Sequence, residues 1–164
     1  MPKKILYIDM DGVLADEQSA LIGISDQMRA KYADNLKDLP GIAGAMLPMT
    51  GAVQAVHDLA ELFDIYVLST ARWTNASVWF DKVNWIKRYF GEDKPDPLYK
   101  KLILTNNKGL NKGDFLVDDN CKNGVDNFEG EWLPFGAKFV NEKFPNQPEF
   151  RDWQTVVEYL KIRA

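Results

Sequence analysis

Two aspartates, Asp9 and Asp11, stand two positions apart, directly after a short apolar run at residues 5–8. The run is partly β-branched and is closed off by Gly12, a pattern that predicts a strand opening into a loop. Two unpaired carboxylates at such a place repel each other and are costly to remove from water. A divalent cation with oxygen ligands offsets both effects. The pair therefore indicates a metal-assisted site that other segments must complete.

Several later segments show the pattern of short strands separated by helices. The strands are expected at residues 5–8, 65–68, 102–104, 115–117 and 137–140. Strands that are apolar on both faces and alternate with helices are typical of a doubly wound α/β fold with a parallel sheet. The sequence thus predicts a Rossmann-like core whose sheet is covered on both sides.

Helical spacing of apolar residues marks three segments, at residues 51–63, 79–90 and 153–160. Thr50 is a candidate N-cap of the first helix, and Gly91 is placed to end the second. The apolar residues that mark the second helix are Trp79, Val83, Ile86 and Phe90.

Residues 16–48 differ from the rest of the chain. Apolar residues first follow helical spacing, and prolines and glycines then interrupt regular structure as far as residue 48. We interpret this stretch as a small helical insertion after the first strand, which leaves residues 1–15 and 49–164 as the α/β core.

Polar residues follow four of the five predicted strands, beginning with Asp9 and Asp11 after the first. Ser69 and Thr70 end the second strand, Lys108 follows the third, and Asp118 and Asp119 end the fourth. Ligands of parallel sheets bind beyond the carboxyl ends of the strands, so these side chains are expected to meet there. Carboxylates, a hydroxyl and an ammonium group around a metal suit phosphoryl transfer, in which one carboxylate attacks phosphorus and another moves the proton.

This order of motifs resembles the haloacid dehalogenase-like phosphohydrolases. Residues 9–14, Asp-Met-Asp-Gly-Val-Leu, match their first motif at all six positions. Thr70, Lys108 and the pair Asp118-Asp119 follow in the order of the other three motifs. Within that superfamily, the segments most similar to the 5'(3')-deoxyribonucleotidases are residues 9–16, 47–53, 85–91 and 102–119.

The resemblance implies a role for each matching residue. Asp9 is expected to be the nucleophile that becomes an aspartyl-phosphate, and Asp11 the general acid and then base. Mg²⁺ is expected on Asp9, on the main-chain carbonyl of Asp11 and on Asp119, with Asp118 as the alternative.

Phosphate oxygens are expected on Thr70, with Ser69 as the alternative, and on Lys108, with Lys112 as a rival. The insertion then becomes a cap over the site. The preferred substrate is a nucleoside monophosphate, and a deoxyribonucleotide in particular.

The cap departs from the mammalian deoxyribonucleotidases in length and in aromatic content. Glu17 stands where those proteins carry a phenylalanine that packs on the base, and Tyr32 is the only aromatic residue between residues 17 and 49. Trp73 is a candidate replacement. Two alternatives therefore stay open: a phosphatase for another small ester such as a sugar phosphate, and a phospho-accepting receiver-like module.

The overall composition limits the kinds of partner that this protein is expected to bind. The 164 residues carry a formal net charge of −4 and show no basic stripe, which argues against a nucleic-acid polymer. The single cysteine, Cys121, excludes an internal disulfide and fits a reducing, cytoplasmic compartment. No apolar stretch approaches the roughly 20 residues that span a bilayer, so no membrane partner is expected. The oligomeric state is left open.

Overall fold

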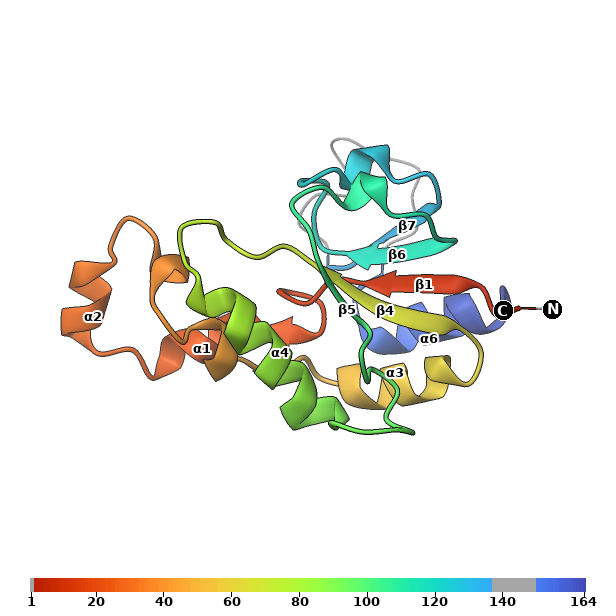
Figure 1. Cartoon of the computed structure of the whole chain (residues 1–164), viewed down its shortest axis with the longest axis horizontal. Helices are drawn as coiled ribbons and strands as arrows, with labels where there is room; N and C mark the ends of the chain where they lie inside the picture. The colour runs from red at the N-terminus through yellow and green to blue at the C-terminus, as the bar shows by residue number, and fades with distance from the viewer. Residues whose placement is uncertain (1, 137–149) are drawn as a thin grey trace.

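The computed structural model describes residues 2–136 and 150–164, and its centre is one parallel sheet of five strands in the order β5-β4-β1-β6-β7. These strands are β1 (Ile5–Ile8), β4 (Asp64–Ser69), β5 (Leu102–Leu104), β6 (Phe115–Asp118) and β7 (Glu131–Pro134). From β1 the chain builds the sheet toward β5, and it then returns to the other side of β1 with β6 and β7 (Figure 1). The predicted doubly wound α/β fold is confirmed, and its strand order reverses between β1 and β6.

Four of the five expected strands are found, and β7 is one that the sequence analysis missed. The fifth strand was placed at residues 137–140, which lie outside the described residues. β7 begins with exposed Glu131 and ends with Pro134, so its apolar pattern is short. Proline is tolerated there because β7 is the last strand of the described sheet, where one side needs no ladder hydrogen bonds.

The two faces of the sheet have different covers. Successive strand residues alternate between two apolar clusters: Leu6 and Ile8 pack in the larger one, Tyr7 in the smaller one. The larger cluster is covered by α3 (Ala52–Ala60), α4 (Ser77–Phe90) and α6 (Trp153–Lys161). The loops with η3 (Lys108–Leu110) and η4 (Val125–Asn127) lie on the opposite face (Figure 1). Among the described residues this second cover contains only short 3-10 turns.

One prediction about the helices, the N-cap of α3, was wrong, and the helix expected at residues 79–90 is confirmed as α4. α3 begins after Gly51, whose φ of +81° sets the turn, and no side chain caps it, so Thr50 is not its N-cap. Trp79 and Val83 of α4 are 39% and 42% exposed, and the side of α4 facing the core carries Lys82 instead. Gly91 ends α4 as predicted. None of the described helices is both long and apolar enough to cross a membrane.

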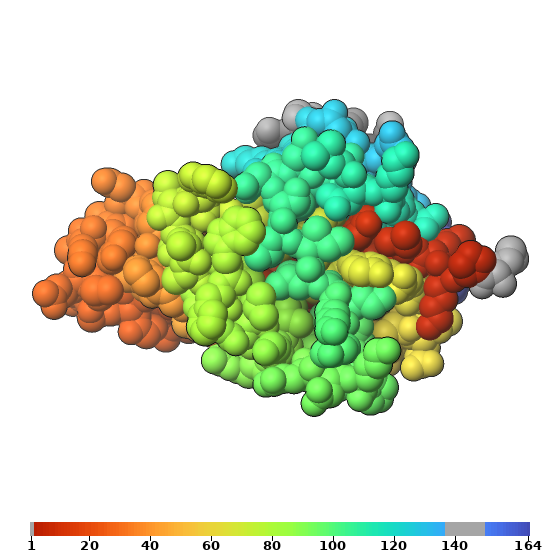
Figure 2. Space-filling view, in the orientation of Figure 1, coloured from red at the N-terminus to blue at the C-terminus, as the bar shows by residue number. Residues whose placement is uncertain are grey.

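The insertion forms a lobe at one end of the molecule, beside α4 (Figures 1 and 2). Its elements and those that flank it are β2 (Ala15–Asp16), α1 (Glu17–Ile22), α2 (Asp26–Lys31), η1 (Leu36–Asp38), η2 (Ala43–Ala45) and β3 (Leu47–Pro48). The chain enters and leaves the lobe through the antiparallel pair β2 and β3. The helical spacing seen in the sequence is divided between two short helices, which are separated at residues 23–25.

Candidate active site

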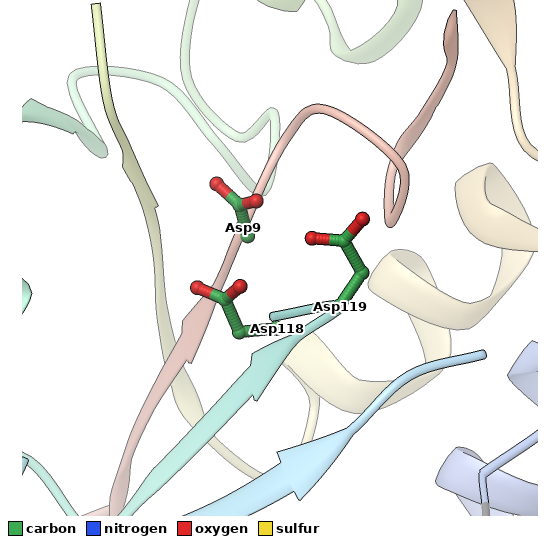
Figure 3. A group of neighbouring side chains, drawn as sticks. All are labelled: Asp9, Asp118 and Asp119. Atoms are coloured by element: carbon green, nitrogen blue, oxygen red, sulfur yellow. The ribbon is translucent and has the colours of Figure 1, made fainter. Parts of the chain in front are cut away.

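Three carboxylates meet where the strand order reverses. Asp9 follows β1, Asp118 ends β6 and Asp119 comes next in the chain, and one oxygen from each lies within 4.8 Å of the others. Figure 3 shows the three carboxyl groups gathered at the ends of the two neighbouring strands. Asp9 is 5% exposed and Asp118 is fully buried. The sheet therefore brings together acidic groups that are more than 100 residues apart in the chain.

Lys108 is the cation of this cluster. Its Nζ lies 2.8 Å from Asp9 Oδ1 and 2.5 Å from Asp118 Oδ2, and the residue is 3% exposed. Its main-chain N–H donates to the carbonyl of Asn123, which ties η3 to the loop after β6. Gly109 lies so close to that loop that a Cβ there would approach the Gly124 carbonyl to 2.7 Å. The close approach of the two loops places the ammonium group above the strand ends.

One ammonium group does not balance three close carboxylates. Burial, and after it the nearby Asp9 carboxylate, raise the pKa of Asp119 to about 6. Burial and Asp9 also raise the pKa of Asp118, against the opposing pull of Lys108. Burial lowers the pKa of Lys108, but the Asp9 and Asp118 carboxylates outweigh it and raise the pKa overall. Three hard oxygen donors with an excess of negative charge are a set that a divalent cation fits.

The turn after β1 packs against this cluster. Gly12 adopts a φ of +78°, and a Cβ at that position would lie 2.5 Å from Asp119 Oδ2. Only glycine therefore suits this turn, both for its conformation and for the space beside Asp119. Asp11, which precedes Gly12, is brought to the same edge of the sheet.

Asp11 presents two different oxygens. Oδ2 accepts a hydrogen bond from Lys82 Nζ at 2.9 Å, whereas Oδ1 is buried without a hydrogen-bond partner among the described residues. Burial raises the pKa of Asp11, Lys82 lowers it, and Asp9 raises it again. A buried acceptor without a partner is costly, and it is often found where a substrate or water binds.

Thr70, the expected phosphate ligand, and Ser69, its alternative, have different environments. Ser69 Oγ is fully buried and accepts from Lys82 Nζ at 2.7 Å. Thr70 Oγ1 is also buried, yet it has no hydrogen-bond partner in the described structure. Thr70 therefore retains a hydroxyl available to a ligand, while Ser69 is already engaged.

A cavity of about 310 Å³ lies over these groups. It is lined by Asp9, Asp11, Glu17, Lys37, Ser69, Thr70, Arg72, Lys108, Asp119, Asn120 and Asn123. Of the residues predicted as catalytic groups, metal ligands or phosphate ligands, Asp118, whose carboxylate pairs with Lys108, and the rival Lys112 lie outside this lining, and the others contribute to it. The lining contains no aromatic residue among the described side chains. Trp73 is 86% exposed and lies outside the lining, so the prediction that Trp73 supplies a base platform finds no support.

The lobe contributes charged residues to the mouth of the cavity. Lys37 pairs with Glu17 at 2.5 Å, and Arg72 from the loop after β4 pairs with Asp38 at 2.8 Å. The sequence analysis singled out Glu17 but not Lys37. It also missed Lys82, whose signal was its place at helical spacing between buried Val78 and Trp85.

Comparison with solved structures defines the class of fold. A HAD-hydrolase from Bacillus subtilis, determined bound to magnesium, matches with a TM-score of 0.60 at 12% identity, covering 98% of this chain and 99% of that one. The haloacid dehalogenase-like protein SP0104 of Streptococcus pneumoniae matches with a TM-score of 0.64 at 9% identity, covering 96% and 98%. The chain thus has the fold of the haloacid dehalogenase-like hydrolases.

Sequence comparison defines the family within that fold. Residues 36–164 match the model of the 5' nucleotidase, deoxy (pyrimidine), cytosolic type C proteins. A protein of Vibrio phage KVP40, assigned as a 5'(3')-deoxyribonucleotidase, is 43% identical over 158 residues, covering 96% of this chain and 85% of that protein. The 5'(3')-deoxyribonucleotidase of Clostridium acetobutylicum is 37% identical over 102 residues, covering 62% of this chain and 52% of the relative. The chain belongs to this nucleotidase family and is an enzyme of the phosphoric monoester hydrolase class.

Proposed function

We propose that this enzyme is a Mg²⁺-dependent phosphomonoesterase that acts through an aspartyl-phosphate on Asp9 and dephosphorylates nucleoside monophosphates, deoxyribonucleotides in particular. The observation that carries the proposal is the meeting of three carboxylates with Lys108 at one cavity. Its support is the unpaired hydroxyl of Thr70 and the unpaired oxygen of Asp11 at the same place. The family and its named relatives supply the substrate class.

Asp9, Asp119 and the main-chain carbonyl of Asp11 would hold the magnesium ion. Asp119 is the better ligand than Asp118, because both oxygens of the Asp118 carboxylate are engaged: Oδ2 accepts from Lys108 Nζ at 2.5 Å and Oδ1 from the Asn120 main-chain N–H at 3.1 Å. Asp118 then serves to hold Lys108 in place. The bound ion supplies charge neutralisation, so that a phosphate dianion can approach the carboxylates.

Each side chain then has one task. An oxygen of Asp9 forms a bond to phosphorus while the bond from phosphorus to the ester oxygen breaks, and Asp11 gives its proton to that oxygen. Lys108 and Thr70 bind the phosphoryl oxygens. In the second step water attacks the phosphorus of the aspartyl-phosphate, Asp11 takes the proton of the water, and phosphate leaves with Asp9 restored.

The lobe at residues 16–48 acts as a cap over the core formed by residues 1–15 and 49–164. Glu17 and Lys37 place cap charges at the mouth of the cavity, where they meet the leaving group of the substrate. Such a cover excludes water from the reacting groups. Because the sequence shows no basic stripe, we assign mononucleotides rather than nucleic-acid polymers as substrates. Because it has a single cysteine, we assign the enzyme to the cytoplasm.

One observation favours a second candidate substrate. The described lining of the cavity is polar and charged, without an aromatic ring on which a base would stack. A sugar phosphate or another small hydroxylated ester suits such a lining equally well. The cavity therefore leaves two substrate classes to be separated by activity.

A panel of phosphate esters tests the proposal. We expect phosphate release from dUMP, dTMP and p-nitrophenyl phosphate that requires Mg²⁺ and is lost in Asp9→Asn. Asp126→Asn, an exposed aspartate outside the cavity, is the matched control and should keep full activity. Faster turnover of sugar phosphates than of every nucleotide would show that sugar phosphates are the preferred substrates. Unchanged turnover by Asp9→Asn would refute the mechanism.

A further inference from the structure

Lys82 is a charged residue at the centre of the buried side of α4. It is fully buried, and each of its three ammonium protons has one acceptor. The acceptors are Asp11 Oδ2 at 2.9 Å, Ser69 Oγ at 2.7 Å and the main-chain carbonyl of Thr70 at 2.8 Å. A buried lysine is tolerated only when it is paired and fully hydrogen-bonded, and this one is.

The acceptors belong to the two segments that carry the reacting groups on this side of the cavity. Asp11 lies in the turn after β1, and the other two acceptors lie at the end of β4. Lys82 therefore links the proposed acid–base carboxylate to the strand end that presents the Thr70 hydroxyl. By occupying Asp11 Oδ2, it leaves Oδ1 as the oxygen without a partner.

The helix that carries Lys82 is firmly seated. Trp85, one turn further on, is fully buried, and its Nε1–H donates to the carbonyl of Met46 at 2.8 Å. A group carried by a packed helix is held more precisely than one on a loop. Lys82 also approaches from the face opposite to Lys108, so the two lysines serve different carboxylates.

We propose that Lys82 is a positioning residue that fixes the Asp11 carboxylate with one oxygen directed to the leaving group and then to the attacking water. This inference rests on the proposed function. It predicts that loss of Lys82 impairs the two proton transfers while the binding of phosphate by Lys108 and Thr70 persists. A misplaced catalytic group costs on the order of 10²-fold in rate.

Lys82→Met tests the inference, with Lys87→Met on the same helix as the matched control, because Lys87 is partly exposed and pairs only with Glu92 in the described structure. On dUMP, whose leaving group needs a proton, we expect kcat to fall about 10²-fold with KM changed less than about threefold. On p-nitrophenyl phosphate, whose leaving group needs no proton, the first step should stay fast and the second should slow. Lys82→Met should then release a burst of nitrophenol close to one equivalent, and Lys87→Met should behave as wild type.

A cycle with Asp11→Asn separates positioning from folding. If Lys82 acts through Asp11, adding Lys82→Met to Asp11→Asn should lower kcat on dUMP by less than about threefold, because the energies of coupled residues do not add. Circular dichroism and size-exclusion chromatography establish that each variant is folded. If Lys82→Met does not fold, Lys82→Gln, which keeps two donors, carries the same test.

Equal losses on both substrates without a burst, or a full further loss in the Asp11→Asn background, would overturn the role of Lys82. Failure of the proposed function is distinct from these results, since wild type would then hydrolyse neither ester, or Asp9→Asn would remain active.

Discussion

The two sides of the cavity are built on different principles. On the core side, Lys82 and Lys108 are buried at 0% and 3% exposure, and each holds carboxylates of the proposed chemistry. On the cap side, the Glu17–Lys37 pair has side chains that are 27% and 55% exposed. Loss of one partner from a buried charge pair strongly destabilises the fold, whereas a solvent-exposed pair contributes little to the free energy of folding. We therefore expect the core side to fix the proposed reaction and the cap side to adjust the choice of substrate.

The largest effect is expected at Asp9. Asp9→Asn removes the attacking oxygen and should lower kcat by about 10⁴-fold or more on every ester, as losses of nucleophiles do. Phosphate release under saturating substrate measures it. Comparable loss from Glu17→Gln on the cap side would abolish the distinction between the two sides.

Lys108→Met should be the next largest change. It leaves Asp9 and Asp118 without their shared cation, so we expect a loss of about 3–5 kcal/mol in the free energy of unfolding without Mg²⁺. Activity should fall by about 10²-fold or more because phosphate loses its fixed charge. Urea unfolding and kcat measure the two effects. Lys112→Met is the matched control. An equal effect in that variant would contradict the assignment of Lys108 as the phosphate-binding lysine.

Metal binding should depend on pH through the carboxylates. The pKa of Asp119 is raised from its usual 3.8 to about 6, so its folded form keeps a proton that the unfolded chain has already lost. Without metal, the free energy of unfolding should therefore fall as pH rises from about 4 to about 7. Magnesium competes with that proton, so the rise in Tm on adding Mg²⁺ should be larger at about pH 7.5 than at about pH 5.5. Thermal unfolding in EDTA and in Mg²⁺ measures it, and the opposite order would contradict the metal site.

Cap variants should give the smallest effects. Lys37→Ala should cost less than about 1 kcal/mol in stability, because its pair with Glu17 is half exposed. It should raise KM several-fold and leave kcat within about threefold of wild type, since Lys37 touches no proposed reacting group. Lys31→Ala, elsewhere on the cap and outside the cavity lining, is the control. A large loss of kcat in Lys37→Ala would show that this cap residue takes part in the reaction itself.

The core side was readable from the sequence because it depends on local pattern. Apolar runs located β1, β4, β5 and β6, and the segments that follow these runs begin at the same edge of a parallel sheet. Asp9, Thr70, Lys108 and Asp119 could therefore be placed together without coordinates.

What the sequence concealed depends on tertiary packing. Lys82 lies at a core position where an apolar residue is expected, and only the seating of α4 against the end of β4 explains it. The sequence favoured Thr70 over Ser69, but only the position of α4 shows that Lys82 engages the Ser69 hydroxyl and leaves that of Thr70 without a partner in the described structure. Trp79 and Val83 correctly marked α4 by their helical spacing, but the spacing could not show that both are partly exposed to solvent.

The central claim is that the reaction passes through a covalent bond at Asp9. It is tested most directly by mixing the Asp11→Asn enzyme with p-nitrophenyl phosphate and Mg²⁺, quenching in acid and locating the phosphoryl group by peptide mass spectrometry. We expect one phosphoryl group on the peptide that contains Asp9. Turnover with no label, or a label on Asp118 or Asp119, would contradict the account.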